Sequence, residues 1–241
     1  MLRVHNVVKR FGGLWAVNTL SFVVEAHQIV GLIGPNGAGK TTLFDLISGF
    51  MPPDAGSISF EGKSILNLKP HRLCKLGVAR TFQIAKPLEN LTVKHNIRIA
   101  AYNSTKSVKE AEYEADRVTE FLGMQHKRQV LASSLTIADR KRLEVARALA
   151  TRPKLILLDE VMAGLRPREI EDFLVLIFSL KDMGITIFMI EHIMKAIMTV
   201  SQKVIVINYG EKIAEGPPEF VTKDKKVIKA YLGEENGTPG D

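Results

Sequence analysis

The stretch of sequence that decides the fold reads Ile29-Val30-Gly31-Leu32-Ile33-Gly34-Pro35-Asn36-Gly37-Ala38-Gly39-Lys40-Thr41. It opens with a run that is apolar on both faces of an extended chain, which is typical of a central strand in a parallel sheet. A glycine-rich turn follows, and a helical pattern then runs from Lys40 to Gly49. A strand, a turn and a helix in this order are the setting in which the pattern G-x-x-x-x-G-K-S/T predicts a phosphate-binding loop.

This loop carries the groups that bind nucleotide phosphates. Its glycines let successive backbone N–H groups turn inward around an anion, and the N-terminus of the following helix adds partial positive charge. Lys40 supplies a full charge for the β- and γ-phosphates, and the Thr41 hydroxyl is placed to ligate Mg²⁺. The residues expected to contact the nucleotide here are Gly34, Pro35, Asn36, Gly37, Ala38, Gly39, Lys40, Thr41 and Thr42.

A second strand supplies the acidic half of the site. The apolar run from Leu155 to Leu158 ends in Asp159 and Glu160. In parallel sheets the carboxyl ends of the strands meet at one edge, where ligands bind. We therefore expect Asp159 to hold Mg²⁺ through water and Glu160 to orient and polarise the attacking water.

Composition narrows the class of protein. The chain has 241 residues, 46% of them hydrophobic and 24% charged, which is ordinary for a globular protein. A formal charge of +7 favours anionic partners, and nucleic acid, lipid headgroups and nucleotides all fit. The single cysteine, Cys74, excludes an intrachain disulfide and suits a reducing compartment. We expect no signal peptide or membrane span, because no apolar run approaches about 20 residues.

The remaining pattern alternates strands with helices. Alternation at Leu2–Val8 and Ser57–Phe60 predicts half-buried strands, and Ile185–Ile190 predicts a buried one. Helical spacing runs from Val108 to Leu122 behind a capping box at Ser107, and a further helix is expected from Ile137 up to Pro153. An α/β fold with a parallel sheet is the economical architecture, and the helix-rich block is expected to be an insertion.

With these motifs in place, the sequence resembles the ATPase subunits of ABC transporters from Leu2 to about Glu234. The resemblance implies an α/β fold with a P-loop NTPase (RecA-like) core. An N-terminal antiparallel β subdomain and an inserted α-helical subdomain complete it. It implies one ATPase domain over residues 1–235, with the helical subdomain at approximately 87–152 and a flexible tail at 236–241.

The resemblance also assigns roles to residues that mean little alone. Phe11 matches an aromatic that stacks on adenine, and Gln83 matches a glutamine that senses Mg²⁺ and the γ-phosphate. His192 matches a histidine that hydrogen-bonds the γ-phosphate. The implied catalytic residues are thus Lys40, Glu160 and His192, and the implied metal ligands are Thr41, Gln83 and, through water, Asp159.

The family's signature sequence, usually Leu-Ser-Gly-Gly-Gln, is altered here to Leu135-Thr136-Ile137-Ala138-Asp139. In relatives this segment starts a helix that points at the ATP of the opposite subunit, so the working unit is a dimer. Asp139 adds negative charge near that anion, and we expect it to weaken closure of the dimer. Val161 and Arg166 also replace a usual Pro and Asp in a loop that crosses the dimer interface in relatives.

The ending Ala230-Tyr231-Leu232-Gly233-Glu234 and the lax signature resemble importers of branched-chain or other hydrophobic amino acids. The implied partners are a second ATPase subunit, an integral-membrane permease and, indirectly, a substrate-binding protein, with no nucleic acid. The implied location is the cytoplasmic face of the inner membrane, as a peripheral protein. In relatives, a segment here at Ile84–Val93 receives a short helix of the permease.

Other readings remain open at the level of sequence. Relatives that import urea or short amides, or that extract lipopolysaccharide, share much of this pattern. A soluble ABC ATPase acting on nucleic acid would suit the basic charge, although such proteins usually carry two cassettes in one chain. A non-enzymatic nucleotide sensor would suit the altered signature, but the intact Lys40, Asp159, Glu160 and His192 argue against it.

Overall fold

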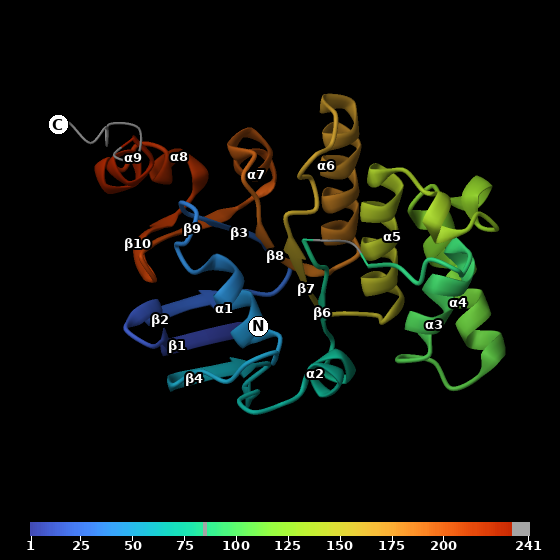
Figure 1. Cartoon of the computed structure of the whole chain (residues 1–241), viewed down its shortest axis with the longest axis horizontal. Coiled ribbons are helices and arrows are strands. Elements are labelled where there is room, and N and C mark those ends of the chain that lie inside the picture. Colours follow the sequence, from blue (N-terminus) through green and yellow to red (C-terminus); the bar gives the residue numbers. More distant parts are fainter. Residues whose placement is uncertain (84–85, 233–241) are drawn as a thin grey trace. The chain divides into compact units, whose positions relative to one another are not determined.

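The computed structural model describes residues 1–83 and 86–232. The chain forms two compact units (Figure 1). Unit 1 comprises Met1–Lys69 together with the chain from Phe188 onward, and unit 2 comprises Pro70–Ile187. The expected tail at 236–241, and Ile84 of the expected permease-binding segment, lie outside the described residues.

The start of unit 1 is an antiparallel sheet in the order β2-β1-β4-β5. In β1 the side chains of Leu2, Val4 and Val7 are buried, as the alternation predicts. The sheet confirms the expected N-terminal antiparallel subdomain. Its strands are β1 (Leu2–Phe11), β2 (Leu14–Val24), β4 (Ala55–Phe60) and β5 (Lys63–Ser64).

Unit 1 also holds the strand that opens the phosphate loop. β3 (Ile29–Ile33) is buried along its whole length and pairs in parallel with β9 (Lys203–Asn208), which pairs antiparallel with β10 (Glu211–Gly216). A Cβ at Gly31 would lie 2.7 Å from Ile197 Cγ1, so α7 packs directly on β3. The helices of unit 1 are α1 (Lys40–Ile47), α7 (Met194–Val200), α8 (Pro218–Val221) and α9 (Lys225–Leu232).

Aromatic packing fixes α1 in unit 1. The ring of Phe188 lies 5.1 Å from that of Phe44 in α1 and 5.5 Å from that of Phe22 in β2, centroid to centroid. Tilted rings at such distances pack favourably beyond the area they bury. The helix that follows the phosphate loop is thereby held against β2.

Unit 2 joins a parallel strand pair to a helical block. β6 (Val78–Arg80) pairs with β7 (Leu155–Asp159), with Val78 beside Leu155 and Arg80 beside Leu157. Helices α3, α4 and α5 pack against one another (Figure 1). The helices of unit 2 are α2 (Pro70–Leu76), α3 (Val93–Ala101), α4 (Val108–Phe121), α5 (Ile137–Ala150) and α6 (Pro167–Asp182), with short turns η1 (Gln125–Lys127) and η2 (Ala132–Ser134).

The capping residues explain where the helices begin. The hydroxyl of Ser107 accepts the N–H of Glu110 at 3.2 Å, as the capping box predicts, while the Glu110 carboxylate accepts the N–H of Lys106 instead of that of Ser107. Thr136 caps α5 in the same way. α5 ends at Ala150, before Pro153 is reached. These caps satisfy N–H groups that a helix start leaves without partners.

The expected strands and helices are therefore present, and the α/β class is confirmed. β8 (Thr186–Ile190) spans the division between the units. Unit 2 is wider than the expected helical insertion, because it includes β6, β7, α2 and α6. The extents of 1–235 and 87–152 stay predictions. Over the described residues, no helix combines the length and apolar character that crossing a bilayer requires.

Candidate functional site

The phosphate loop owes its shape to glycine. Gly39, which precedes α1, has φ +101, and a Cβ there would lie 2.0 Å from the carbonyl oxygen of Ala16. A Cβ at Gly34 would lie 2.1 Å from the carbonyl oxygen of Ile207. Any side chain at either position would displace backbone, so the loop requires glycine there for both space and, at Gly39, conformation.

Lys40 holds its charge inside this loop. The residue is 7% exposed, and its Nζ donates to the carbonyl oxygens of Gly34 at 2.6 Å and Pro35 at 2.8 Å. Both acceptors belong to the loop itself. Lys40 is also the first residue of α1. The full charge of its ammonium group and the partial positive charge of the helix N-terminus therefore both lie at the phosphate loop.

The acidic site lies in unit 2, at the end of β7. The Asp159 carboxylate is 3% exposed and accepts from Arg80 Nη2 at 2.9 Å, and the Arg80 guanidinium is 6% exposed. The Asp159 N–H donates to Thr81 Oγ1 at 3.1 Å. β6 and β7 pair side by side, which is why Arg80 reaches Asp159.

Glu160 follows in a backbone conformation that is rare for its type, with φ +49. It is 8% exposed, and its Oε2 accepts from Gln83 Nε2 at 2.6 Å. The buried carboxylate is therefore held in one orientation by Gln83. Chemically, a fixed carboxylate of this kind can orient a water molecule and accept its proton.

The structure thus brings Gln83, Asp159 and Glu160 together within unit 2. Phe11, the phosphate loop and His192 belong to unit 1. Phe11 is 49% exposed at the end of β1, with Lys9 Nζ 5.7 Å from its ring centroid. His192 is exposed just after β8. Their expected contacts with nucleotide stay predictions.

The altered signature forms a small polar cluster. Thr136 Oγ1 accepts the N–H of Asp139 at 3.2 Å and donates to the Asp139 carboxylate at 2.6 Å, which also accepts from Lys127 Nζ at 2.6 Å. Burial opposes ionisation of Asp139, but the hydrogen bonds from Lys127 and Thr136 outweigh it and keep the pKa of this carboxyl below its ordinary value. The charge that was expected to repel ATP is paired within the chain.

The other unusual position, Arg166, precedes α6. Its N–H donates to Glu169 Oε2 at 2.8 Å, and Pro167 occupies the first helical position. Both features are typical of a helix N-terminus, so the residues from Arg166 to Glu169 are explained by the start of α6.

Sequence reasoning missed three charged residues of these sites: Arg80, Lys127 and Lys141. Lys141 is 7% exposed in α5, and its Nζ donates to the carbonyl oxygens of Gln83 and Glu160, each at 2.9 Å. Neither a motif nor helical spacing identifies it, because a lysine in an amphipathic helix is ordinarily solvent-exposed.

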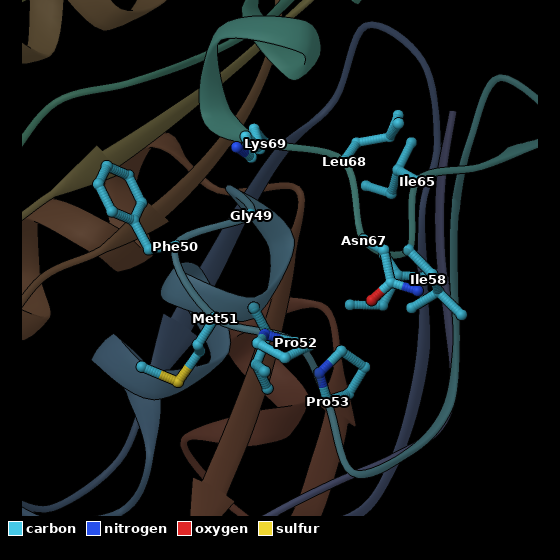
Figure 2. A pocket seen from close by; sticks show the side chains of 12 residues that line it. Gly49, Phe50, Met51, Pro52, Pro53, Ile58, Ile65, Asn67, Leu68 and Lys69 are labelled. Atoms are coloured by element: carbon cyan, nitrogen blue, oxygen red, sulfur yellow. The ribbon is translucent and has the colours of Figure 1, made fainter.

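A pocket of about 160 Å³ in unit 1 contains none of the predicted site residues (Figure 2). Pro52 and Pro53 line it from the segment after α1, and Ile65, Asn67 and Leu68 line it from the loop after β5. Lys69 is the one charged residue of its lining. This apolar lining does not suit nucleotide phosphates, so the candidate for phosphate binding in unit 1 is the loop at 34–41 and not this pocket.

Two family models match the chain. One, described as ABC transporter, matches residues 17–163, and the other, described as Branched-chain amino acid ATP-binding cassette transporter, matches residues 211–236. A glycine-rich loop before a helix and a strand that ends in two acids are typical of P-loop ATPases on an α/β fold. The chain belongs to this family, the ATP-binding subunits of ABC transporters.

Relatives and solved structures agree along nearly the whole chain. The high-affinity branched-chain amino acid transport ATP-binding protein BraF of Pseudomonas aeruginosa is 38% identical, over 97% of this chain and 98% of that protein. LivG of Escherichia coli (strain K12), which carries the same description, has the same identity and coverage. A nucleotide-free ATP-binding cassette from an ABC transporter superposes with a TM-score of 0.88 at 34% identity, over 96% of this chain and 98% of that one. The ADP conformation of an ATP-binding cassette gives 0.87 at 34%, over 97% and 98%.

Proposed function

We propose that this chain is the ATP-hydrolysing subunit of an importer for branched-chain or other hydrophobic amino acids. The observation that carries the proposal is its similarity, over 97% of the chain, to branched-chain amino acid transport ATP-binding proteins. The family-specific match at 211–236, over β10, α8 and α9, supports the same branch. Importers of urea or short amides and lipopolysaccharide-transport systems, which share much of the sequence pattern, are the alternatives that the test must separate.

In ATP hydrolysis, the phosphate loop binds the nucleotide phosphates and the acidic site activates the attacking water. The loop N–H groups and Lys40 bind the β- and γ-phosphates, Phe11 stacks on adenine, and His192 donates to the γ-phosphate. Glu160 orients water for in-line attack on the γ-phosphorus and accepts its proton, while the bond to the β–γ bridging oxygen breaks. ADP and inorganic phosphate are the products.

Mg²⁺ fits the residues present. Thr41, Gln83 and Asp159 offer hydroxyl, amide and carboxylate oxygens, which are the hard ligands this ion prefers alongside water and phosphate oxygens. The Gln83 amide uses its Nε2 on Glu160, so its oxygen is the atom suited to the metal. Bound Mg²⁺ would neutralise charge on the phosphates. The Asp159 carboxylate, oriented by Arg80, would act through water.

The chain would work as a dimer at the cytoplasmic face of the membrane. The start of α5, with Thr136–Asp139, would contact the ATP held by the second ATPase subunit, which is a self-complementary arrangement.

The permease contact is assigned to the segment around Leu88. Its side chain is 41% exposed, while Pro87 is buried, so the two apolar residues have different surroundings. The backbone is fixed by buried Asn96, whose Oδ1 accepts the Leu88 N–H at 2.8 Å and whose Nδ2 donates to the Leu88 carbonyl at 3.0 Å. An exposed leucine on a fixed backbone is a suitable contact for a partner helix.

The test is co-purification and uptake. The chain would be expressed with the permease and binding protein of a branched-chain amino acid importer, purified through the permease, and reconstituted in vesicles loaded with MgATP. We expect ATP-dependent uptake of leucine, isoleucine or valine, and we expect Leu88→Glu to abolish co-purification without loss of ATP binding. Uptake of urea or a short amide instead would move the chain to another branch of the family.

A further inference from the structure

Lys141 is a buried cation in the middle of unit 2. It lies on α5, and its ammonium group donates to two backbone carbonyls that are far apart in the sequence, those of Gln83 and Glu160. Burying a charged group is unfavourable unless hydrogen bonds compensate for the lost water. The two carbonyls therefore stabilise the buried ammonium group, and the ammonium group in turn fixes the two backbone segments that carry them.

The bonds of Lys141 close a ring. Its Nζ donates to Gln83 O and Glu160 O, each at 2.9 Å, and the Gln83 side chain donates from Nε2 to Glu160 Oε2 at 2.6 Å. One cation thus joins the backbones of two residues whose side chains contact each other. The Glu160 carboxylate is thereby linked to α5 through Gln83 and through the backbone of Glu160 itself.

The backbone of Glu160 needs such support. Its φ of +49 lies in the left-handed region, which residues other than glycine adopt at a cost and which persists only where the surroundings hold it. The ammonium group of Lys141 bonds the carbonyl oxygen of this very residue. The strained residue and the buried cation belong to one arrangement.

We propose that Lys141 is a positioning residue that holds Gln83 and Glu160 in register and transmits movement of α5 to the Glu160 carboxylate. The inference rests on the proposed function, which gives Glu160 its role toward water. Lys141 follows Asp139 by less than one helical turn, so a nucleotide contact at the start of α5 displaces the Lys141 ammonium group with the helix. The carbonyl of Glu160 follows, and its carboxylate is reoriented.

The test compares Lys141→Met, Lys141→Arg and a matched control in steady-state ATP hydrolysis. Methionine keeps the length of the side chain and removes the ammonium group. We expect kcat to fall between about 10- and 100-fold, as for a small misplacement of a catalytic group, with KM for ATP within about twofold. Lys141→Arg, which keeps the donors, restores part of kcat.

The control is Glu144→Gln on the same helix. Glu144 is also buried, and its partner is Arg147 at 2.8 Å, which donates to the Lys86 carbonyl at 3.1 Å. A purely structural role for Lys141 would give the two variants similar losses of melting temperature and similar, small effects on kcat. The proposal requires the kcat loss to occur at Lys141 alone.

A second readout does not depend on turnover. Without nucleotide, hydrogen exchange in the peptide that contains Glu160–Gly164 should be faster in Lys141→Met than in wild type, and unchanged in Glu144→Gln. If Lys141→Met does not fold, Lys141→Gln, which keeps a donor on a shorter side chain, takes its place in both measurements. Wild-type kcat and exchange in a folded variant would overturn the inference, whereas absence of ATPase activity in wild type would overturn the proposed function.

Discussion

Two lysines, each 7% exposed, have buried ammonium groups whose hydrogen-bond acceptors lie in different parts of the chain. Lys40 in unit 1 donates to the carbonyls of Gly34 and Pro35, within its own loop. Lys141 in unit 2 donates to carbonyls of Gln83 and Glu160, on segments that are distant from it in the chain. The printed acceptors of Lys40 thus lie in its own loop, whereas those of Lys141 lie on two other segments, so replacing Lys141 is expected to loosen contacts between segments.

The contrast extends to the two units around them. The phosphate loop requires glycine at Gly34 and Gly39, because the backbone carbonyls of Ile207 and Ala16 approach these positions closely. Unit 2 joins its segments with ion pairs that contain a buried carboxylate, Asp159 with Arg80 and Glu114 with the half-exposed Arg152. At the two buried lysines, the charge is bonded within one loop in unit 1 and joins separate segments in unit 2.

The largest expected effect separates binding from turnover. Glu160→Gln keeps the shape of the residue and removes the base, so ATP should bind as in wild type while kcat falls by about 10²- to 10⁴-fold. The variant should accumulate as an ATP-bound dimer, which gel filtration with MgATP would detect. Hydrolysis within about threefold of wild type would remove Glu160 from the mechanism, since this is a barrier change under roughly 0.7 kcal/mol.

The second effect tests whether Lys40 is local. Lys40→Met should weaken ATP binding by about 10- to 100-fold, the value of a hydrogen bond to a charged group, and leave the melting temperature almost unchanged. Lys203→Met is the matched control, because Lys203 donates to the carbonyl of Val23 and pairs with Glu215 in the same unit. It should lower the melting temperature and leave ATP binding intact. The reverse pattern would break the comparison between the two lysines.

The same contrast explains what the sequence predicts. The strand, turn and helix around Lys40 were predictable because the residues of the motif itself lie within a short window, Ile29 to Thr41. The approach of the Ala16 and Ile207 carbonyls to its glycines was not predictable from that window. The tie at Lys141 was not, since its acceptors lie on other segments and a helical lysine is ordinarily exposed. Repulsion by Asp139 was expected for the same reason, because Lys127, its partner, belongs to a different turn of the chain.

Replacing either member of the Asp139–Lys127 pair should change ATP-driven dimerisation by a smaller factor, and the two replacements should act in opposite directions. Asp139→Gln leaves the Lys127 charge uncompensated beside the start of α5, so ATP-driven dimerisation should strengthen by about three- to tenfold at low salt. Lys127→Met leaves the Asp139 charge uncompensated and should weaken it by a similar factor. Both effects should shrink near 1 M salt, where the screening length falls to about 3 Å. Sedimentation with MgATP would measure them.

If both variants weaken dimerisation at every salt concentration, charge is not the cause. The pair would then act by fixing the start of α5, through Thr136, which Asp139 also contacts. Asp139 would then have a structural role, as Lys141 has in joining two backbone segments.

The smallest effect concerns stability and pH in unit 2. Glu114 is 1% exposed in α4, and its carboxylate accepts from Arg117 and from Arg152, the latter at 2.8 Å. Burial raises the pKa of this carboxyl, but the hydrogen bonds and charges of the two arginines outweigh burial and hold it below the ordinary value of 4.5. Its ionised form is therefore favoured in the folded state, so the stabilisation is complete above pH 4.5 and is lost as pH falls through the lowered pKa.

Glu114→Gln should cost about 1.5–3 kcal/mol near pH 7, or several degrees in Tm, and the difference from wild type should shrink as the pH falls below 4.5. Asp116→Asn is the control on the same helix, because Asp116 is 51% exposed in its pair with Lys94 and should cost under about 0.5 kcal/mol at any pH. Melting curves from pH 3 to pH 8 that stay parallel for wild type and Glu114→Gln would mean that the Glu114 charge does not tie α4 to the end of α5, and that unit 2 relies on its apolar core as unit 1 does.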